Sequence, residues 1–241
     1  MKLINSSENP SREGIWNMFD TISPTYDRVN KMMTFGLDSF WRKKIAKFLP
    51  ERKEMALLDC ATGTADQIFT LLQQNPNIDQ VVGIDLAKSM LKIGEKKLRN
   101  TPYEKKVMLI EANALDLPFT PFTFDVVTMS FGIRNVTDVM LCLSEIFRVL
   151  KSGGRVIILE CSTPENRLLK TGYLLYCRHL LPKIGGWISK TPEAYRYLNK
   201  TAESFPSGKA FCNLLNKAGF INVASVPLTF GTVSIYLGDK P

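Results

Sequence analysis

The sequence predicts an α/β protein with a doubly wound, mostly parallel sheet of seven strands. Short apolar runs rich in β-branched residues alternate along the chain with segments of helical periodicity, which is the order of strand–helix–strand units. The runs are apolar almost throughout, as expected for strands covered on both faces. A short turn at Gly231 separates the last two runs, so we expect an antiparallel terminal strand. At 241 residues the chain suits a single domain.

The strands and helices are expected in a definite order. Strands are expected at residues 55–60, 81–86, 107–111, 124–129, 155–161, 222–228 and 232–237. Helices are expected at residues 66–74, 89–100, 138–150 and 207–218. Ser89 and Asp138 stand directly before periodic segments, so each is expected to cap its helix. Gly153 and Gly154 should turn the chain into the fifth strand, and Gly219 should end the last helix.

Composition argues against several classes of protein. The chain is 45% hydrophobic and 22% charged, as in soluble globular proteins, and no apolar run approaches the roughly 20 residues that span a bilayer. The polar segment 1–12 is not followed by an apolar one, so we expect no secretory leader. Without a CxxC pair, the cysteines are expected to be reduced thiols of a cytosolic protein: Cys60, Cys142, Cys161, Cys177 and Cys212. With His179 as the single histidine, neither a metal site nor a serine triad is expected.

The formal net charge of +8 is compatible with three kinds of partner, namely nucleic acid, an anionic membrane surface or an acidic substrate. The densest basic segments are Arg42-Lys43-Lys44 and Lys96-Lys97, and their spacing is typical of solvated helix faces. The sequence contains no RNA-binding signature, so we expect no nucleic-acid partner.

A short loop follows the first predicted strand, in the segment LLDCATGTAD at residues 57–66. Asp59 ends that strand, and Gly63 allows a ligand to approach the backbone closely. Asp85 ends the second strand 22 residues after Gly63, where an acidic residue can accept hydrogen bonds from ribose hydroxyls. This spacing predicts a cofactor that contains a nucleoside.

The loop also bears on the kind of cofactor. A dinucleotide site would need GxGxxG, but Gly63 is the single glycine of this loop and the acidic Asp59 precedes it. Such a loop suits a cofactor with a cationic centre and no phosphates, and S-adenosylmethionine fits that description. Asp59 and the loop backbone would hold its amino-acid part, and Asp85 would hold its ribose. The alternative for Asp59 is a helix-capping or loop-bracing role.

The third strand ends in a polar amide next to a small residue. Asn113 or its backbone can pair with the edge of an adenine ring, and Ala114 leaves room for that ring. Their position at the carboxyl end of the strand favours adenine binding, although an asparagine in a turn is a common alternative.

The segment FDVVTMSFGIRNVTD, residues 124–138, joins a buried strand, an abrupt glycine turn and a small polar cluster. Gly132 lets the chain leave the strand sharply, so that Ser130, Arg134 and Asn135 project where open α/β sheets bind their ligands. On this segment alone, a ligand-binding arginine and an arginine paired with a carboxylate at the sheet edge are equally supported.

Several motifs together resemble one known family. They are MFDTISPTYD at residues 18–27, DCATGTAD at 59–66, DLAKSML at 85–91, SFGIRNV at 130–136 and RVLK at 148–151. In these motifs the chain is similar to the ubiquinone/menaquinone biosynthesis C-methyltransferases of the UbiE/MenG type, over nearly its whole length. The resemblance implies a Rossmann-like class I methyltransferase with S-adenosylmethionine as donor. It also implies a polyprenylated quinol precursor as acceptor, in menaquinone biosynthesis (demethylmenaquinol to menaquinol), ubiquinone biosynthesis or both.

The resemblance assigns a set of residues to the cofactor, namely Thr64, Asp85, Asn113 with Ala114, and Ser130. The sequence departs from the family in the loop, which usually reads D-x-A-G-G-T-G-D. Here Thr62 and Ala65 take the places of glycines. We therefore expect a tighter loop and weaker cofactor binding.

The implied acceptor constrains the chemistry. Methyl transfer to an aromatic carbon needs an electron-rich ring, so the reduced quinol is the expected substrate, and a base must take up a proton directly or through water. Arg134, beside Asn135, is expected to stabilise a developing phenolate or to organise a water. Because arginine stays protonated, Arg134 is not expected to be the base itself. Tyr26, Asp27 and Tyr197 are secondary candidates.

Residues 166–206 interrupt the strand pattern and are expected to cover the acceptor. The segment has an apolar stripe at helical spacing (Leu169, Tyr173, Tyr176 and Leu180) with basic flanks (Arg167, Lys170, Arg178 and Lys183). Two functions are open for it: packing on the core, or a lid that grips a prenyl tail and rests on an anionic bilayer. The second function predicts a cytoplasmic protein that is peripheral to the inner face of the membrane.

The single domain, residues 1–241, is therefore expected to have four parts. These are an N-terminal helical cap (1–50), a cofactor-binding core (51–165), the acceptor lid (166–206) and a terminal helix with a strand hairpin (207–241). Three other functions remain open. They are a methyltransferase for another small molecule, an RNA methyltransferase, which lacks support because no NPPY-like tetrad is present, and a cofactor-poor homologue that is not an enzyme.

Overall fold

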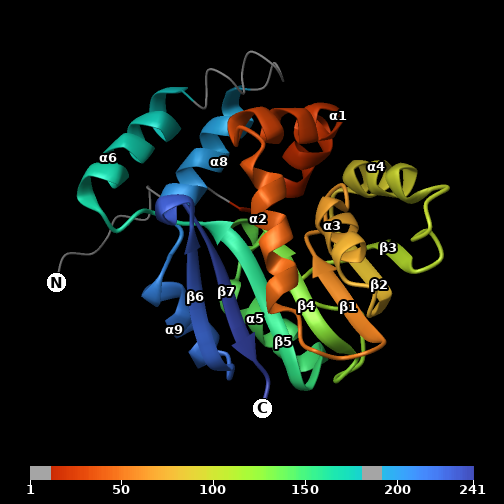
Figure 1. Ribbon diagram of the computed structural model, residues 1–241. Coiled ribbons are helices and arrows are strands. Elements are labelled where there is room, and N and C mark those ends of the chain that lie inside the picture. Colours follow the sequence, from red (N-terminus) through yellow and green to blue (C-terminus); the bar gives the residue numbers. More distant parts are fainter. Residues whose placement is uncertain (1–11, 181–191) are drawn as a thin grey trace.

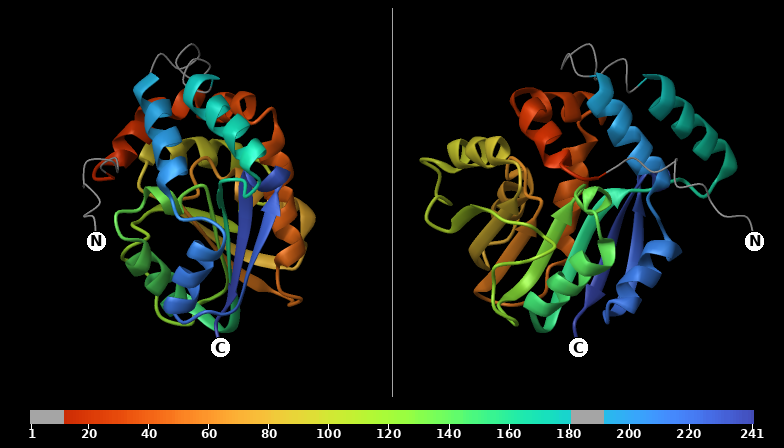
Figure 2. Two further views of the ribbon diagram at one scale, coloured as in Figure 1. Left: turned by 90° about the vertical axis from the view of Figure 1, so that its left-hand side faces the viewer. Right: turned by 180° about the vertical axis from the view of Figure 1, so that it is seen from behind.

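The computed structural model describes residues 12–180 and 192–241, which form a seven-stranded sheet covered by helices on both faces (Figures 1 and 2). The strand order is β3-β2-β1-β4-β5-β7-β6, and β7 runs antiparallel to both of its neighbours. The strands are β1 (Met55–Cys60), β2 (Ile78–Asp85), β3 (Val107–Glu111), β4 (Phe124–Ser130), β5 (Leu150–Cys161), β6 (Ile221–Leu228) and β7 (Val233–Asp239). This arrangement confirms the predicted doubly wound fold with an antiparallel terminal strand.

The helices form two layers and a group above the sheet. Helices α2 (Leu37–Ile45) and α3 (Asp66–Gln74) pack on one face, and α5 (Val139–Val149) and α9 (Lys209–Lys217) pack on the other. Above the carboxyl ends of the parallel strands lie α1 (Ile15–Met33), α6 (Arg167–Leu175) and α8 (Pro192–Ser204), as Figure 1 shows. The remaining elements are α4 (Lys88–Leu98) and the short turns η1 (Ala46–Phe48), η2 (Ile133–Asn135), η3 (Tyr176–Leu180) and η4 (Thr229–Gly231).

Two hydrophobic cores explain why the strands are apolar almost throughout. All seven residues of β4 are buried, and successive side chains point to opposite faces of the sheet. Val127 and Met129 join the core beneath α5 and α9, whereas Val126 joins the core beneath α2 and α3. In β5 the same alternation separates Ile158 from Ile157. Because a core covers each face of the sheet, side chains that point to either face are buried. Apolar and polar residues therefore do not alternate regularly along these strands.

The strand boundaries differ most from those predicted at the starts of two strands. Strand β2 begins at Ile78, three residues earlier than expected. Strand β5 begins at Leu150, so Gly153 and Gly154 lie inside it and do not precede it. The pairing register shifts here, because Leu150 faces Phe124 while Arg155 faces Val126, and Gly153 takes a left-handed φ of 69°. The prediction of a turn was wrong because the glycines form an irregularity within the strand.

The predicted helix caps have different outcomes. Asp138 caps α5 as expected, because its side chain accepts a hydrogen bond from the Leu141 N–H at 2.9 Å. The cap at Ser89 is wrong, since α4 begins one residue before Ser89 and Ala87 occupies the cap position. The Ser89 N–H instead donates to Asp20 Oδ1 of α1 at 2.8 Å, so a distant helix supplies the missing acceptor. Within the described ranges, no helix is long and apolar enough to cross a membrane.

Candidate functional site

Two adjoining cavities lie beneath α1 at the carboxyl ends of β1, β2 and β4. The first has a volume of about 380 Å³ and the second a volume of about 290 Å³. Both cavities are lined by Tyr26, Ala61, Gly63, Ser130 and Phe131, which we call the shared rim. A molecule in one cavity is therefore separated from a molecule in the other only by this rim.

The first cavity brings together most of the residues predicted to bind a cofactor: Gly63, Asp85, Asn113, Ala114 and Ser130 all line it. Asp59 and Thr64 instead line the second cavity. The proposed catalytic pair also divides, because Asn135 lines the first cavity and Arg134 the second. The strand ends thus gather all these residues at one edge of the sheet, on the two sides of the shared rim.

Asp85, the last residue of β2, faces the loop after β1. Its Oδ2 accepts a hydrogen bond from the Gly63 N–H at 2.8 Å, and its Oδ1 accepts one from the Ala87 N–H at 2.9 Å. Burial raises the pKa of this carboxyl, and the backbone hydrogen bonds from Ala87 and Gly63 oppose that effect. Each carboxylate oxygen can accept a further hydrogen bond, so Asp85 can still bind ligand hydroxyls.

Asn113 and Ser130 have their own partners in the protein. Asn113 Oδ1 accepts a hydrogen bond from the Leu115 N–H at 3.0 Å, so this oxygen shapes the turn after β3. Ser130 donates its hydroxyl to Gln67 Oε1 of α3 at 3.0 Å and is buried. Both residues still line the first cavity, and Ser130 also belongs to the shared rim.

Asp59 lies beneath the loop and is only 1% exposed. Its carboxylate accepts hydrogen bonds from the hydroxyls of Thr62, at 2.7 Å, and of Thr128, at 2.6 Å. Burial raises the pKa of Asp59 to about 6, although both hydroxyls favour the charged form. These contacts are those expected of a residue that stabilises the loop. Thr62, which replaces a glycine of the family loop, supplies one of the two hydroxyl groups that Asp59 binds.

Three residues of the same loop have left-handed backbones: Ala61 at φ 51°, Gly63 at φ 56° and Ala65 at φ 65°. A non-glycine residue in this conformation costs about 1–2 kcal/mol. Ala65 therefore has the left-handed backbone conformation that a glycine would adopt without strain. The substitution strains the loop at this residue and leaves its backbone path in that conformation.

A network of polar contacts holds helix α1 over the loop that follows β1. Lys97 Nζ contacts Asp27 Oδ2 at 2.7 Å, Asp66 Oδ1 at 2.6 Å and Thr64 Oγ1 at 2.9 Å. The Thr64 hydroxyl in turn donates to Asp27 Oδ1 at 2.8 Å. Together with the Asp20–Ser89 hydrogen bond, these contacts join α1 to both ends of α4. Thr64 and Asp27 thus hold the cover of the site in place.

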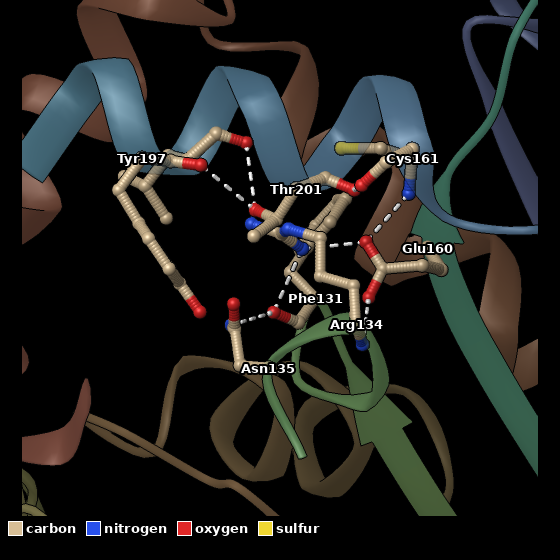
Figure 3. A network of polar contacts seen from close by, with 9 residues as sticks. Phe131, Arg134, Asn135, Glu160, Cys161, Tyr197 and Thr201 are labelled. Atoms are coloured by element: carbon tan, nitrogen blue, oxygen red, sulfur yellow. Dashed lines mark hydrogen bonds and ion pairs between the residues drawn. The ribbon is translucent and has the colours of Figure 1, made fainter. Parts of the chain in front are cut away.

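Arg134 forms a buried ion pair with Glu160 of β5, and also donates to the Phe131 carbonyl oxygen at 2.8 Å (Figure 3). Burial lowers the pKa of the guanidinium, but the Glu160 carboxylate outweighs this effect and raises it. The sequence analysis left open whether Arg134 binds a ligand or pairs with a sheet-edge carboxylate. The structure shows the pairing with Glu160, and the same arginine lines the second cavity. The sequence analysis did not identify this partner, although Glu160 is the single acid of the β5 segment and could have indicated it.

Asn135 and Tyr197 each bury a polar atom for which the described residues offer no partner. The Asn135 amide nitrogen donates weakly to the Phe131 carbonyl oxygen at 3.4 Å, but Oδ1 has no hydrogen bond. The Tyr197 hydroxyl is likewise buried without one. Figure 3 shows the two side chains directed toward one another from η2 and α8. Of the two residues Asn135 lines the first cavity, and an unpartnered buried polar atom at a cavity is typical of a group that binds a ligand or water.

The second cavity contains a cation that the sequence analysis assigned to solvent. Arg42 of α2 lines this cavity, and its guanidinium lies 5.5 Å from the centroid of the Phe131 ring. Among the described residues, the buried Arg42 Nε has no hydrogen-bond partner. Desolvation raises the pKa of Tyr26 on the shared rim, while a hydrogen bond with Asn30 lowers it. Lys43 is exposed as expected, but the interpretation as a solvated face was wrong for Arg42. It was also wrong for Lys97, which takes part in the polar network beneath α1.

The predicted lid segment contributes to the second cavity. Tyr173 and Tyr176 line it together with Leu198 of α8, and the Tyr176 hydroxyl donates to the Met33 carbonyl oxygen at 2.6 Å. Tyr173 and Tyr176 of the apolar stripe thus line the cavity, whereas Leu169 of the stripe is exposed. The neighbouring Leu168 and Leu175 are exposed as well. Of the predicted basic flanks, Arg178 is paired with Glu203 at 2.8 Å, and Lys183 lies outside the described residues.

Two thiols lie at the site, because Cys161 and Cys177 line the second cavity. The five cysteines, all within the described ranges, form no disulfide, and burial raises the pKa of Cys142 and of Cys161 to about 12. In residues 12–180 and 192–241, no group of three or more His, Cys, Asp or Glu side chains could hold a metal ion.

Solved structures of methyltransferases share this fold. A SAM-dependent methyltransferase from Thermotoga maritima superposes with a TM-score of 0.66 at 20% identity, covering 94% of this chain and 100% of that chain. A SAM dependent methyltransferase from Aquifex aeolicus has a TM-score of 0.62 at 17% identity, covering 88% of this chain and 96% of that chain. The architecture is therefore that of the class I methyltransferases.

The chain belongs to the ubiE/COQ5 methyltransferase family, which its residues 6–240 match. It is 41% identical, over 95% of this chain and 89% of the relative, to the ubiquinone/menaquinone biosynthesis C-methyltransferase UbiE of Geobacter sulfurreducens. It is 37% identical, over 97% of this chain and 98% of the relative, to the demethylmenaquinone methyltransferase of Anoxybacillus flavithermus. The family resemblance seen in the motifs is confirmed, and the protein is a methyltransferase.

Proposed function

We propose that the protein transfers the methyl group of S-adenosylmethionine to a ring carbon of a polyprenylated quinol precursor. The reaction is demethylmenaquinol to menaquinol, a step of ubiquinone biosynthesis, or both. The observation that supports it most strongly is the pair of cavities that meet at the shared rim, one for the donor and one for the acceptor. The relatives named for ubiquinone and menaquinone biosynthesis support the acceptor class.

The first cavity suits the donor by its own chemistry. Met90 and Leu115 offer apolar walls for an adenine ring, and Asp85 has lone pairs for ribose hydroxyls. Asn113, Ala114, Ser130 and the Gly63 backbone would complete the donor site, with Asp59 and Thr64 acting on it through the loop. When bound, S-adenosylmethionine supplies an activated methyl group with a cationic centre. The protein then has to align this methyl with the acceptor and exclude water.

The second cavity suits an aromatic acceptor that becomes more anionic as it reacts. Trp41, Phe131 and Tyr173 provide flat apolar surface for a quinol ring. Arg134 and Arg42 add guanidinium groups that can stabilise a phenolate oxygen. Because an arginine keeps its proton, another group must take up the proton that the quinol loses.

Two unpartnered polar atoms, one on η2 and one on α8, are proposed to serve the acceptor. Asn135 Oδ1 and the Tyr197 hydroxyl are buried without partners among the described residues. We assign them to a quinol hydroxyl or to the water that removes its proton. Asn135 lines the first cavity and Arg134 lines the second, on opposite sides of the shared rim. Asn135 can therefore contact the reacting groups from the donor side, and Arg134 can contact the quinol ring from the acceptor side.

The tail of the acceptor has two consequences for the protein. Residues 166–206 would serve as the acceptor lid, since Tyr173, Tyr176 and Leu198 of this segment line the second cavity. A quinol with an isoprenoid tail resides in the bilayer, so the protein would work in the cytoplasm and in peripheral contact with the inner face of the membrane.

Turnover with a panel of acceptors tests this function. We expect methylation of reduced polyprenylated demethylmenaquinol or its benzoquinol counterpart, and none of the oxidised quinones, because the ring carbon must be electron-rich. Turnover confined to an acceptor that is not a quinol would contradict the proposal and favour another small-molecule methyltransferase. Failure to bind S-adenosylmethionine in calorimetry would instead indicate the cofactor-poor homologue.

A further inference from the structure

Exposed apolar side chains gather at the entrance of the second cavity. We call them the entrance patch, which consists of Met32, Phe35, Leu37, Phe40 and Phe230. Phe35 and Leu37 also line the cavity, so the patch begins where the cavity opens. Trp41 Nε1 donates to Thr229 Oγ1 at 2.7 Å, which holds the turn that bears Phe230 against α2. Segments far apart in sequence, namely α2 and the turn between β6 and β7, are thus joined at the carboxyl end of the sheet.

The backbone of the patch is unusual at its two most exposed aromatic residues. Phe230 is 79% exposed and Phe35 is 74% exposed. Both have left-handed backbones, with φ of 58° and 51°, and each precedes a glycine with positive φ, Gly231 and Gly36. A left-handed phenylalanine is strained, and its exposed ring forgoes burial. Two such residues beside one cavity indicate that the outward-facing rings have a use at the surface.

The charge around the entrance patch is positive. Lys43, Lys44 and Lys47 follow Phe40 at the spacing of one helix face, and Lys44 Nζ lies 4.9 Å from the centroid of the Phe40 ring. Lys31 is exposed next to Met32. The neighbouring acid, Asp38, accepts a hydrogen bond from the Thr34 hydroxyl at 3.1 Å. Exposed aromatic rings bordered by lysines are the side chains that favour an anionic membrane interface.

We propose that the entrance patch docks on an anionic lipid bilayer, with its phenylalanines among the headgroups and the second cavity open to the lipid. The inference rests on the proposed function, because a prenylated quinol would then enter the cavity directly from the bilayer. A second copy of the chain fits the patch less well, since two copies would bring the same lysines together. The net charge of +8 favours the bilayer for the same reason.

Flotation with vesicles tests the docking surface. The full chain should bind phosphatidylcholine vesicles that contain phosphatidylglycerol, and bind pure phosphatidylcholine or vesicles in high salt much less. Phe40→Ser with Phe230→Ser should weaken partitioning by at least about tenfold, through the loss of apolar insertion. Lys43→Gln with Lys47→Gln should weaken it by about fivefold per lysine, and only on the anionic vesicles.

Matched controls lie outside the patch. Leu141→Ser removes a residue of α5 that is 45% exposed, and Lys92→Gln with Lys96→Gln removes exposed charge from α4; neither change should affect flotation. Absence of vesicle binding by the parent protein at low salt would overturn the inference. So would equal effects of control and patch variants, or a dimer in sedimentation that Phe40→Ser with Phe230→Ser dissociates.

A soluble acceptor separates this inference from the proposed function. Turnover of a short-tailed, water-soluble quinol should be unchanged in Phe40→Ser with Phe230→Ser, while turnover of a long-tailed quinol in vesicles should fall. Equal loss with both acceptors would assign the phenylalanines to the reaction and contradict docking. If the parent protein methylates neither quinol but still binds anionic vesicles through the patch, the proposed function fails and the docking surface remains.

Discussion

The Asp85 carboxylate accepts a hydrogen bond from the Gly63 N–H at 2.8 Å, which joins the end of β2 to the loop after β1. The same side chain lines the first cavity, and Gly63 also belongs to the shared rim. One carboxylate therefore both shapes the loop and faces the proposed donor. Its replacement should affect donor binding more than any other single change at this edge of the sheet.

Asp85→Ala should weaken S-adenosylmethionine binding by about 2–4 kcal/mol, because a charged acceptor for the ribose hydroxyls is lost. Isothermal titration calorimetry measures this directly. Asp79→Ala is the matched control, since Asp79 is an exposed acid of the same strand. Unchanged affinity in a folded Asp85→Ala variant would remove Asp85 from the donor site.

Arg134→Lys should lower turnover by at least about tenfold while donor affinity stays nearly the same. Lysine keeps the charge but loses the planar guanidinium, whose Nη1 contacts both Glu160 and the Phe131 carbonyl oxygen. Steady-state kinetics with a reduced quinol and calorimetry with the donor check the two parts. Normal turnover would leave Arg134 with a structural role in its pair with Glu160.

The pH dependence of stability should contain a contribution from Asp59. Its pKa rises from 3.8 to about 6 on folding, so the folded protein binds this proton more tightly than the unfolded chain. The resulting stabilisation is present below pH 3.8 and is lost as the pH rises through 6. Relative to Asp59→Asn, the free energy of unfolding of the parent should therefore fall by about 2 kcal/mol across this interval. Urea unfolding at the two ends of the interval measures the difference, and a constant difference would contradict the raised pKa.

Lys97→Met should loosen α1 over the site, because Lys97 contacts Asp27, Asp66 and Thr64 at once. We expect faster amide hydrogen exchange in residues 15–33 and weaker donor binding. Lys96→Met is the control, since Lys96 is exposed on the same helix. Equal exchange rates in the two variants would show that α1 is held by its apolar contacts alone.

The fold was predictable because each strand is short, apolar and followed by a turn or helix signal. The two errors at strand β5 and Ser89 have physical causes that a local pattern does not contain. Gly153 forms an irregularity in the pairing of β5 with β4, and pairing register depends on both strands. The N-terminus of α4 uses Asp20 of another helix as an acceptor, which made a local cap at Ser89 unnecessary.

The site was predictable at strand ends and less so on helices. Asp85, Asn113 and Ser130 follow from their places after parallel strands. Arg42 was missed because it stands in a basic triplet, and successive residues of a helix point in different directions. Arg42 faces the cavity while Lys43 faces solvent, and only the packing of α2 decides which residue turns inward.

The most direct measurement follows the methyl group itself. The protein is incubated with S-adenosylmethionine that bears a deuterated methyl group and with reduced demethylmenaquinol, and the product is analysed by mass spectrometry and NMR. We predict one deuterated methyl group on a ring carbon and none when the quinone is kept oxidised. Donor that binds without any methyl transfer to the quinol, or a methyl group found on oxygen, would contradict the proposed function.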